Sequence, residues 1–376
     1  MCGCSSDKTK ETTIKKNQIN QNNPNDITKP YFEKSNLQDI EMKNKNGKYY
    51  IKRKENKGIF GEVYKVMSVI NHEDYAAKKI NIDNSKNKNI GVKEINALTQ
   101  CHHPNIICLI DIFKTYTYKR GKSLYIITDY ADDGNLQHKL NLQIRGKIII
   151  DEITLIMWLL QICLGLSYLH KKNIIHRDIK PENIFLTKKG LIKIGDLGLA
   201  KQYESEKDLE KKSSFAGTPN YMAQEVKSGK YDNKVDIYSL GMTYYRFLET
   251  NINEYGDKLK NLISTLISTN PEERPTSDEI LNTPIIQNGM KQFLKKYKEE
   301  SIYNFILAKL KQKNKLNKNT EENDDSFISN IEIERNKLIK ERNIDDKSRY
   351  KKDLDILMCI ISWKIEKSIN FNMKNN

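Results

Sequence analysis

The most informative segment of this chain reads Ile175-His176-Arg177-Asp178-Ile179-Lys180-Pro181-Glu182-Asn183. It places a carboxylate, an ammonium group and a side-chain amide within six residues. Such a set can handle a hydroxyl nucleophile, a phosphoryl group and a metal ion together. A second acidic site, Asp196-Leu197-Gly198, begins thirteen residues after Asn183 and ends another apolar run. The two segments together predict a site for phosphoryl transfer.

These segments resemble the catalytic and metal-binding loops of eukaryotic protein kinases, which read H-R-D-x-x-x-x-N and D-F-G. A later segment, Lys211–Tyr221, resembles the activation segments of polo-like and NIMA-related serine/threonine kinases. The resemblance covers residues 48–285 and implies an α+β, bilobal protein kinase fold. A small β-rich N-lobe with one regulatory helix would span residues 48–130, and a larger helical C-lobe residues 131–285.

The residue pattern agrees with that layout. Tyr49–Tyr130 contains mainly short β-type runs, interrupted by one helical stretch around Gly91–Cys101. Ile153–His170 is apolar nearly all round, which predicts a helix buried inside a lobe, and Asp236–Glu249 predicts a second one.

Two polar segments flank this domain. Residues 1–47 are rich in Asn, Lys, Gln and Thr and predict a disordered arm. Residues 286–376 predict a polar tail that is helical or partly disordered. Within the tail, the apolar stretch Leu354–Trp363 either binds a partner or packs against its own domain.

The net charge of +15 raises the possibility of a nucleic-acid partner, but it is spread along the chain without a block of five like charges. We therefore expect no nucleic-acid binding. Six cysteines without zinc-like spacing indicate reduced thiols and a cytoplasmic protein. No apolar run approaches the roughly 18 residues of a membrane span. Cys2 and Cys4 could carry palmitate, a weak anchor that does not amount to stable membrane insertion.

The nucleotide side of the expected cleft begins with Gly58-Ile59-Phe60-Gly61-Glu62-Val63, which resembles the end of the kinase glycine-rich loop. Asn56 replaces the first glycine of that pattern. Glu55 stands where the family usually places an apolar residue above the adenine of ATP. These two departures motivate the alternative of a pseudokinase scaffold with weakened nucleotide binding.

The next motif, Tyr75-Ala76-Ala77-Lys78-Lys79-Ile80, resembles V-A-I-K. Alternate residues of a strand share a face, so Ala76 and Lys78 point together while Lys79 points the other way. The adenine-facing small residue and the phosphate-binding lysine must share the cleft side. We therefore assign these roles to Ala76 and Lys78, and the resemblance makes Glu94 the counter-charge of Lys78.

The resemblance places the hinge between the lobes at Asp129-Tyr130-Ala131, where backbone groups would read the adenine. Thr128 matches the gatekeeper position. Phe185 would form the floor of the adenine pocket.

For the transfer itself, the resemblance makes Asp178 the residue that accepts the proton of the substrate hydroxyl. Lys180 would neutralise charge on the transferring phosphate, and Asn183 with Asp196 would hold Mg²⁺. Lys180 and Thr218 match the serine/threonine members of the family.

Regulation is expected on the activation segment, between Asp196 and Glu225. Arg177 would read a phosphate there, and Ser214, next to Ser213, aligns best with the activating site. Two interpretations remain about equal: these serines are regulatory, or they are solvated loop residues.

Three expectations concern the large lobe. Glu225 should form a buried ion pair with Arg274, and Asp236 should brace the catalytic loop. Only about twenty residues separate Leu248 from the Arg274 motif, so the usual substrate-docking helix should be shortened or absent.

The sequence thus predicts a protein serine/threonine kinase that transfers the γ-phosphoryl group of ATP, with Mg²⁺ as cofactor, to protein substrates. The pseudokinase scaffold is the first alternative. An RNA-binding protein is the second, and it rests on charge alone.

Overall fold

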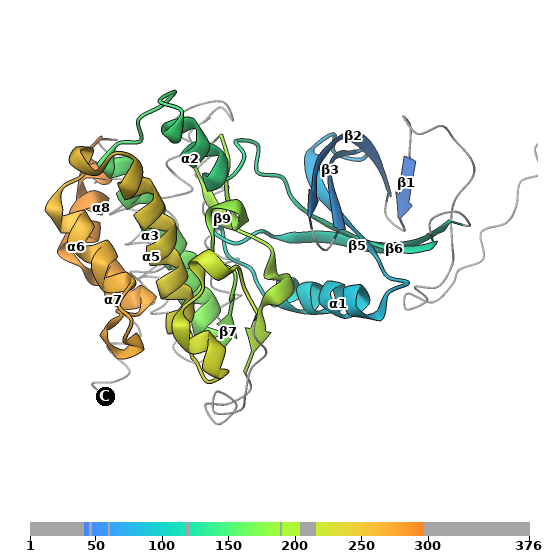
Figure 1. Cartoon of the computed structure of the whole chain (residues 1–376). Coiled ribbons are helices and arrows are strands. Elements are labelled where there is room, and N and C mark those ends of the chain that lie inside the picture. Colours follow the sequence, from blue (N-terminus) through green and yellow to red (C-terminus); the bar gives the residue numbers. More distant parts are fainter. Residues whose placement is uncertain are drawn as a thin grey trace, which may run out of the picture.

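The computed structural model describes residues 41–44, 47–58, 61–117, 121–188, 190–203 and 216–296. These residues form two lobes, a sheet with one long helix and a larger body of helices, joined near residue 130 (Figure 1). This is the α+β, two-lobed arrangement that the sequence predicts. Ser213, Ser214, Cys2, Cys4 and the stretch Leu354–Trp363 lie outside the described residues.

The N-lobe is an antiparallel sheet with the strand order β1-β2-β3-β4-β6-β5. Its strands are β1 (Glu41–Asn44), β2 (Gly47–Gly58), β3 (Gly61–Ser68), β4 (Asp74–Asn81), β5 (Leu109–Thr117) and β6 (Gly121–Asp129). Residues 41–44, which the sequence predicts as part of a disordered arm, instead form β1, which pairs with β2 from Glu41↔Tyr50 to Asn44↔Gly47.

The two faces of the sheet are packed differently. One face carries a small aromatic core in which Phe113 stacks on Tyr125 with ring centroids 5.0 Å apart. The other face, with Ile80 and Leu124, packs against helix α1 (Ser85–Thr99). This helix begins six residues before the stretch predicted for it, because the Asn84 side chain caps its first turn by accepting a hydrogen bond from the Lys86 N–H at 2.8 Å.

The C-lobe is built around helix α3 (Glu152–Lys171), which Asp151 caps at its N-terminus. Contrary to the expectation that no apolar run approaches the length of a membrane span, this helix is long and apolar enough to cross a membrane, but 83% of its most apolar window is buried inside the domain. It is the core helix predicted for Ile153–His170. The helices around it are α2 (Leu136–Ile144), α5 (Lys234–Thr250), α6 (Asp257–Leu266), α7 (Ser277–Asn282) and α8 (Pro284–Lys296).

Two short antiparallel strand pairs lie in this lobe. Strand β8 (Ile184–Leu186) pairs with β9 (Ile192–Ile194), and β7 (Ile174–Ile175) pairs with β10 (Lys201–Gln202). Short 3₁₀ turns complete the loops between the elements: η1 (Pro181–Asn183), η2 (Leu197–Leu199), η3 (Pro219–Tyr221), η4 (Gln224–Ser228), η5 (Ile252–Glu254) and η6 (Pro271–Glu273).

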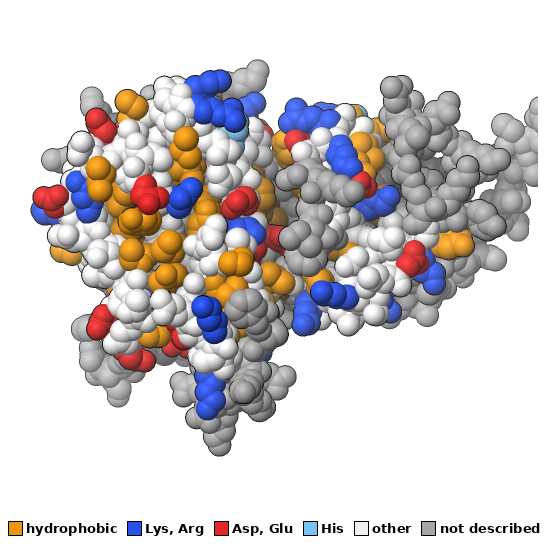
Figure 2. Space-filling model, in the orientation of Figure 1, with side chains coloured by type: hydrophobic (Ala, Val, Ile, Leu, Met, Phe, Trp, Pro, Cys, Tyr) orange, Lys and Arg blue, Asp and Glu red, His pale blue; other side chains and the backbone are white. Residues whose placement is uncertain are grey.

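The expected loss of a helix after α5 is confirmed. Residues 251–256, all of them described, hold only the turn η5 before α6 begins. Tyr245 and Ile252 remain 40% and 55% exposed beside this connection. Hydrophobic side chains gather on the front of the helical lobe, over which α5 runs (Figures 1 and 2).

The C-terminal end of the domain lies beyond the boundary predicted at residue 285. Helix α8 continues from Pro284, and its Ile286 and Met290 are buried. Gly289 lies against Ile156 of α3, where an added Cβ would come within 2.6 Å of the Ile156 side chain. Helix α8 is therefore part of the core, and the helical pattern of the tail begins inside the domain.

Candidate active site

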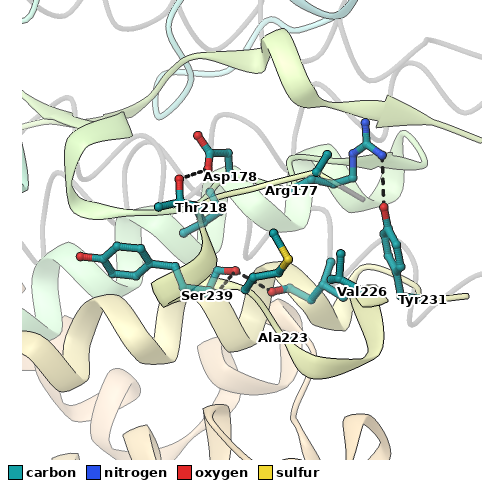
Figure 3. A pocket seen from close by; sticks show the side chains of 12 residues that line it. Arg177, Asp178, Thr218, Ala223, Val226, Tyr231 and Ser239 are labelled. Atoms are coloured by element: carbon teal, nitrogen blue, oxygen red, sulfur yellow. Dashed lines mark hydrogen bonds between the residues drawn. The ribbon is translucent and has the colours of Figure 1, made fainter. Parts of the chain in front are cut away.

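The centre of the site is the carboxylate of Asp178, which has polar neighbours on each side. Thr218 Oγ1 donates a 2.6 Å hydrogen bond to Oδ1, and the Asn183 amide donates a 2.8 Å bond to Oδ2. Lys180 Nζ lies 2.8 Å from Asp178 Oδ2 and donates to Thr218 Oγ1 at 2.7 Å. The structure thus gathers the carboxylate, ammonium and amide that the sequence places within six residues. It adds Thr218 from a segment forty residues away, and Figure 3 shows its contact with Asp178.

Asp236, at the start of α5, binds the backbone of the loop that carries these groups. Its carboxylate accepts hydrogen bonds of 2.8 Å from the backbone N–H groups of His176 and Arg177, and it lies 3.0 Å from His170 Nε2. Asp236 is fully buried. Burial raises the pKa of this carboxyl, but the hydrogen bond and charge of His170 outweigh it and hold the pKa below its usual value. The bracing expected of Asp236 is therefore present.

His176 links the two predicted loops. Its Nε2 lies 2.9 Å from the carbonyl of Gly195, and its Nδ1 accepts from the Asp178 N–H at 3.2 Å. The proton must therefore sit on Nε2. Leu98 and Leu197 lie in the same continuous core, and Leu109 packs against it.

Asn183 and Asp196 come together because β8 and β9 form a hairpin. Asn183 precedes β8, Asp196 follows β9, and the Gly195 N–H donates to the Asn183 carbonyl at 2.9 Å. Asp196 has left-handed backbone angles, with φ of 60°. Such a conformation is unusual outside glycine and marks a functional turn.

The side chains of Asn183 and Asp196 supply oxygen atoms that suit a magnesium ion. Asn183 uses its amide nitrogen on Asp178, which leaves the amide oxygen as an acceptor. Asp196 bonds Lys78 through Oδ1. Mg²⁺ is usually held by one or two protein oxygens, with substrate phosphates and water supplying the rest. Among the described residues, no group of three or more His, Cys, Asp or Glu is arranged as a metal centre.

Lys78 lies between two carboxylates. Its Nζ is 2.8 and 2.9 Å from the two Glu94 oxygens and 2.7 Å from Asp196 Oδ1. Burial lowers the pKa of Lys78, but the charges of Glu94 and Asp196 outweigh it and raise the pKa well above its ordinary value. Burial likewise raises the pKa of Asp196, and here Lys78 prevails and holds it low. For Glu94, burial and the charge of Asp196 keep the pKa raised although Lys78 opposes them.

The strand register explains why Lys78 and not its neighbour reaches the cleft. Lys78 pairs with Val63 of β3, and Ala76 pairs with Lys65, so Val63, Ala76 and Lys78 share the arrangement predicted from alternation. The glycine turn follows from the same ladder, because Gly58 pairs with Gly61. A Cβ on Gly61 would lie 2.2 Å from the Lys79 carbonyl oxygen, so glycine is required there.

The hinge is fixed by the side chain of Asp129 as well as by its backbone. The carboxylate binds Lys193 of β9 and accepts from the Cys108 N–H at 3.2 Å. Ala131 follows in the connection between the lobes, and Thr128 comes directly after the buried run Ser123–Ile127 of β6. Phe185, the expected pocket floor, packs against Gly195, where a Cβ would come within 2.9 Å of its ring.

Arg177 contacts the beginning of the activation segment. Its guanidinium donates to the Leu199 carbonyl at 2.7 Å and to the Tyr231 hydroxyl at 3.1 Å. Together with Asp178 and Thr218 it lines a pocket whose apolar part includes Met222, Ala223 and Val226 (Figure 3). Because Ser213 and Ser214 lie outside the described residues, their relation to Arg177 stays a prediction.

Glu225 and Arg274 form the expected ion pair at the base of this segment. The two guanidinium nitrogens lie 2.5 and 3.1 Å from the two carboxylate oxygens, and Arg274 is 1% exposed.

Sequence reasoning did not anticipate three polar contacts near the cleft. They are the pairing of Lys193 with Asp129, the contact of His170 with Asp236, and a hydrogen-bonded group of Arg53, Glu55 and Tyr130. The spacing of motifs along the sequence does not show which residues more than sixty positions apart come into contact. The one available signal was the charge of Glu55 at a position where an apolar residue was expected.

Comparison with known proteins agrees with this geometry. The model of the family described as "Protein kinase domain" matches residues 49–253, which is more than half of the chain, and the chain belongs to this family. Relatives include the serine/threonine-protein kinase Nek4 of Mus musculus, 33% identical over 289 residues that make up 69% of this chain and 35% of the relative. A putative serine/threonine-protein kinase A of Trypanosoma brucei brucei is 31% identical over 269 residues, 64% of this chain and 61% of the relative.

The serine/threonine-protein kinase Nek1 of Mus musculus is 33% identical over 273 residues, 66% of this chain and 22% of the relative. In all three cases the matching part spans less than two thirds of the relative. Of the two subfamilies suggested by the activation segment, the Nek relatives support the NIMA-related one.

Proposed function

We propose that this chain is a Mg²⁺- and ATP-dependent protein serine/threonine kinase. The observation that carries the proposal is the position of Lys78, whose ammonium contacts Glu94 and Asp196 at once. That contact joins the N-lobe to the metal-binding loop of the C-lobe, as a kinase requires before it can transfer phosphate.

In this proposal the γ-phosphorus of ATP is attacked by the oxygen of a serine or threonine hydroxyl. The bond between the γ-phosphorus and the oxygen that bridges it to the β-phosphate breaks, and ADP leaves with that oxygen. Asp178 accepts the hydroxyl proton, while Lys180 stabilises the charge on the phosphoryl oxygens. Asn183 and Asp196 would hold Mg²⁺, which supplies charge neutralisation at the phosphates.

The acceptor side supports a polypeptide substrate. The pocket that adjoins Asp178 has an apolar part with Met222, Ala223 and Val226, which suits a side chain next to the acceptor residue. Thr218 lies between Asp178 and Lys180 and supports assignment to serine and threonine hydroxyls.

The test compares the wild-type chain with Asp178→Asn for incorporation of the γ-phosphate into itself and into a general protein acceptor. Asp178→Asn keeps the shape of the side chain but removes the base, so incorporation should fall by about 100-fold or more. Equal labelling of both proteins would reject the kinase proposal.

A pseudokinase scaffold remains the second candidate, supported by Asn56 and Glu55, which stand where the family pattern has a glycine and an apolar residue. It predicts that the folded wild-type protein binds a fluorescent ATP analogue weakly and transfers no phosphate.

We further propose that a phosphate on the activation segment, at Ser214 or Ser213, engages Arg177. Mass spectrometry after incubation with Mg-ATP would locate it, and a wild-type rate unchanged in Ser213→Ala/Ser214→Ala would contradict it. The cytoplasmic location, the polar arm at residues 1–40 and a partner for the C-terminal tail are also kept as proposals.

A further inference from the structure

The end of strand β2 carries a β-bulge at Glu55. In the ladder between β2 and β3, Lys54 pairs with Tyr64 and Asn56 pairs with Val63, so Glu55 has no partner in register. A bulge of this kind turns a side chain away from the direction that regular alternation would give it. Glu55 therefore does not follow the alternation of the strand. It lies three residues before Gly58, where the glycine turn begins.

The side chain of Glu55 reaches the hinge. Its Oε1 accepts a 2.7 Å hydrogen bond from the Tyr130 hydroxyl and a 2.8 Å bond from Arg53 Nε. Arg53 also donates through its NH2 group to the Tyr130 oxygen at 3.1 Å. Each of the three side chains therefore contacts the other two, and the ring of contacts joins residues 75 positions apart in the sequence.

Two further contacts hold Tyr130 in place. Lys65, which pairs with Arg53 in the sheet, places its Nζ 4.4 Å from the centroid of the Tyr130 ring. This is a cation–π distance, and the same ammonium lies 2.8 Å from Asp74. The residue before Tyr130 is Asp129, whose carboxylate is bound by Lys193. Tyr130 is thus a fixed point to which the end of β2 is attached.

We propose that Arg53, Glu55 and Tyr130 form a clasp between β2 and the hinge that positions the glycine turn and sets the affinity of the chain for its nucleotide. The proposal rests on the proposed kinase function. It replaces the simple expectation that Glu55 lies above the adenine as a substitute for an apolar residue. The three are positioning residues, because they act through the turn and not on the reacting atoms.

The physical reason is preorganisation. An end of β2 that adopts several orientations before binding loses that freedom when the nucleotide arrives. A strand end attached to both β3 and the hinge has fewer orientations than one attached to β3 alone. The attachment should therefore improve nucleotide binding while leaving the contacts of Asp178 unchanged.

The protonation states support the clasp near neutral pH. Burial raises the pKa of Glu55, but the hydrogen bonds from Tyr130 and Arg53 outweigh it and hold the pKa below its usual value. Burial and the hydrogen bond to Glu55 raise the pKa of Tyr130. The carboxylate remains an acceptor and the phenol remains a donor.

The experiment measures the dissociation constant of Mg-ADP and of a fluorescent ATP analogue for the full chain, together with kcat and the KM for ATP. Tyr130→Phe removes one hydroxyl and keeps the ring under Lys65. Glu55→Ala removes the carboxylate, and Glu55→Gln keeps an acceptor. Because partly exposed charged contacts are worth up to about 1 kcal/mol, Tyr130→Phe and Glu55→Ala should each weaken binding by about three- to fivefold.

The double variant Glu55→Ala/Tyr130→Phe should be no weaker than the single ones, since both remove the same attachment. Glu55→Gln should restore part of the affinity, and kcat should change little while KM rises. Lys52→Ala is the matched control, because it removes a 2.5 Å ion pair with Asp74 from the same strand without touching the hinge.

Additive effects, or unchanged affinity in Tyr130→Phe and Glu55→Ala, would overturn the clasp. So would an equal loss in Lys52→Ala, which would show that any contact of β2 matters. A wild-type chain that binds no nucleotide rejects the clasp as well. A chain that binds nucleotide through the clasp but labels equally with Asp178→Asn rejects the kinase function alone.

Discussion

The hydroxyl of Thr218 donates a 2.6 Å hydrogen bond to the carboxylate of Asp178, and it accepts one of 2.7 Å from Lys180. The activation segment is thereby attached to the proposed base itself. Thr218 both donates to Asp178 and lines the acceptor pocket, so the positions of Asp178 and of the pocket depend on each other.

Removing that hydroxyl should impair phosphoryl transfer more than nucleotide binding. Thr218→Val keeps the shape of the side chain but leaves Asp178 and Lys180 without their shared neighbour, so kcat should fall by about 10- to 100-fold through misplacement. Thr218→Ser keeps the hydroxyl and should retain most of the activity. Steady-state kinetics with a peptide acceptor would measure both, and equal losses in the two variants would argue against a role for the hydroxyl.

The two neighbouring lysines of β4 should behave differently. Lys78→Met removes the ammonium between Glu94 and Asp196 and should lower phosphoryl transfer by about 100-fold or more. Lys79→Met is the matched control on the opposite face of the strand and should retain near wild-type activity. A larger loss in Lys79→Met than in Lys78→Met would mean that the face assignment fails.

Lys78→Met should also destabilise the fold, because the carboxylate of Glu94 is 4% exposed and would lose its partner. Loss of one member of a buried pair costs about 3–5 kcal/mol, and the second change Glu94→Gln should recover part of it. Urea denaturation of the single and double variants would check this, and a double variant as unstable as the single one would contradict the charge argument.

The ion pair of Glu225 with Arg274 is expected to be structural. Glu225→Gln leaves the guanidinium of Arg274 buried against a neutral amide and should lower the free energy of unfolding by about 3 kcal/mol. The exposed pair of Arg246 and Glu249, with 3.4 Å between its nearest charged atoms, provides the control. Arg246→Ala should cost less than about 1 kcal/mol, and similar losses in both variants would contradict the assignment.

Stability should decline in mild acid through His103. Burial, aided by the charges of Lys193 and Lys171, lowers the pKa of His103 to about 3 from its ordinary value of 6.5. Between these values the unfolded chain binds a proton that the folded chain does not. The stabilisation is therefore complete above pH 6.5 and is lost as the pH falls toward 3, by at most about 1.4 kcal/mol per pH unit.

Because His103 is only partly buried, the slope should lie below that limit. Urea denaturation between pH 7 and 5 would measure it. His103→Gln should flatten the profile, whereas His138→Gln, at an exposed position, should not. A wild-type profile without decline over this range would refute the prediction.

The sequence was sufficient for the parts of the site that depend on local spacing. Asp178, Lys180 and Asn183 lie in one loop, and strand alternation together with the resemblance to V-A-I-K selected Lys78 over Lys79. The helical core was also predictable, because α3 is apolar on every side.

The remaining features depend on contacts that local patterns do not encode. Strand β1 is defined by pairing with β2, and helix α1 begins with polar residues that only the cap at Asn84 explains. The contact of Glu55 with Tyr130 requires a β-bulge. A bulge interrupts the alternation from which the faces of a strand are predicted.

The single ammonium group of Lys78 contacts two carboxylates, those of Glu94 and Asp196, so this cluster carries excess negative charge. That excess charge has a consequence for the choice of ligand. The raised pKa of Glu94 reflects in part its repulsion by Asp196. A divalent cation on Asp196 would relieve that repulsion and strengthen the link between the regulatory helix and β4. By thermodynamic linkage, ordering of that helix would in turn tighten cation binding. Free nucleotide would meet surplus negative charge, so the chain should prefer the metal–nucleotide complex to its uncomplexed form.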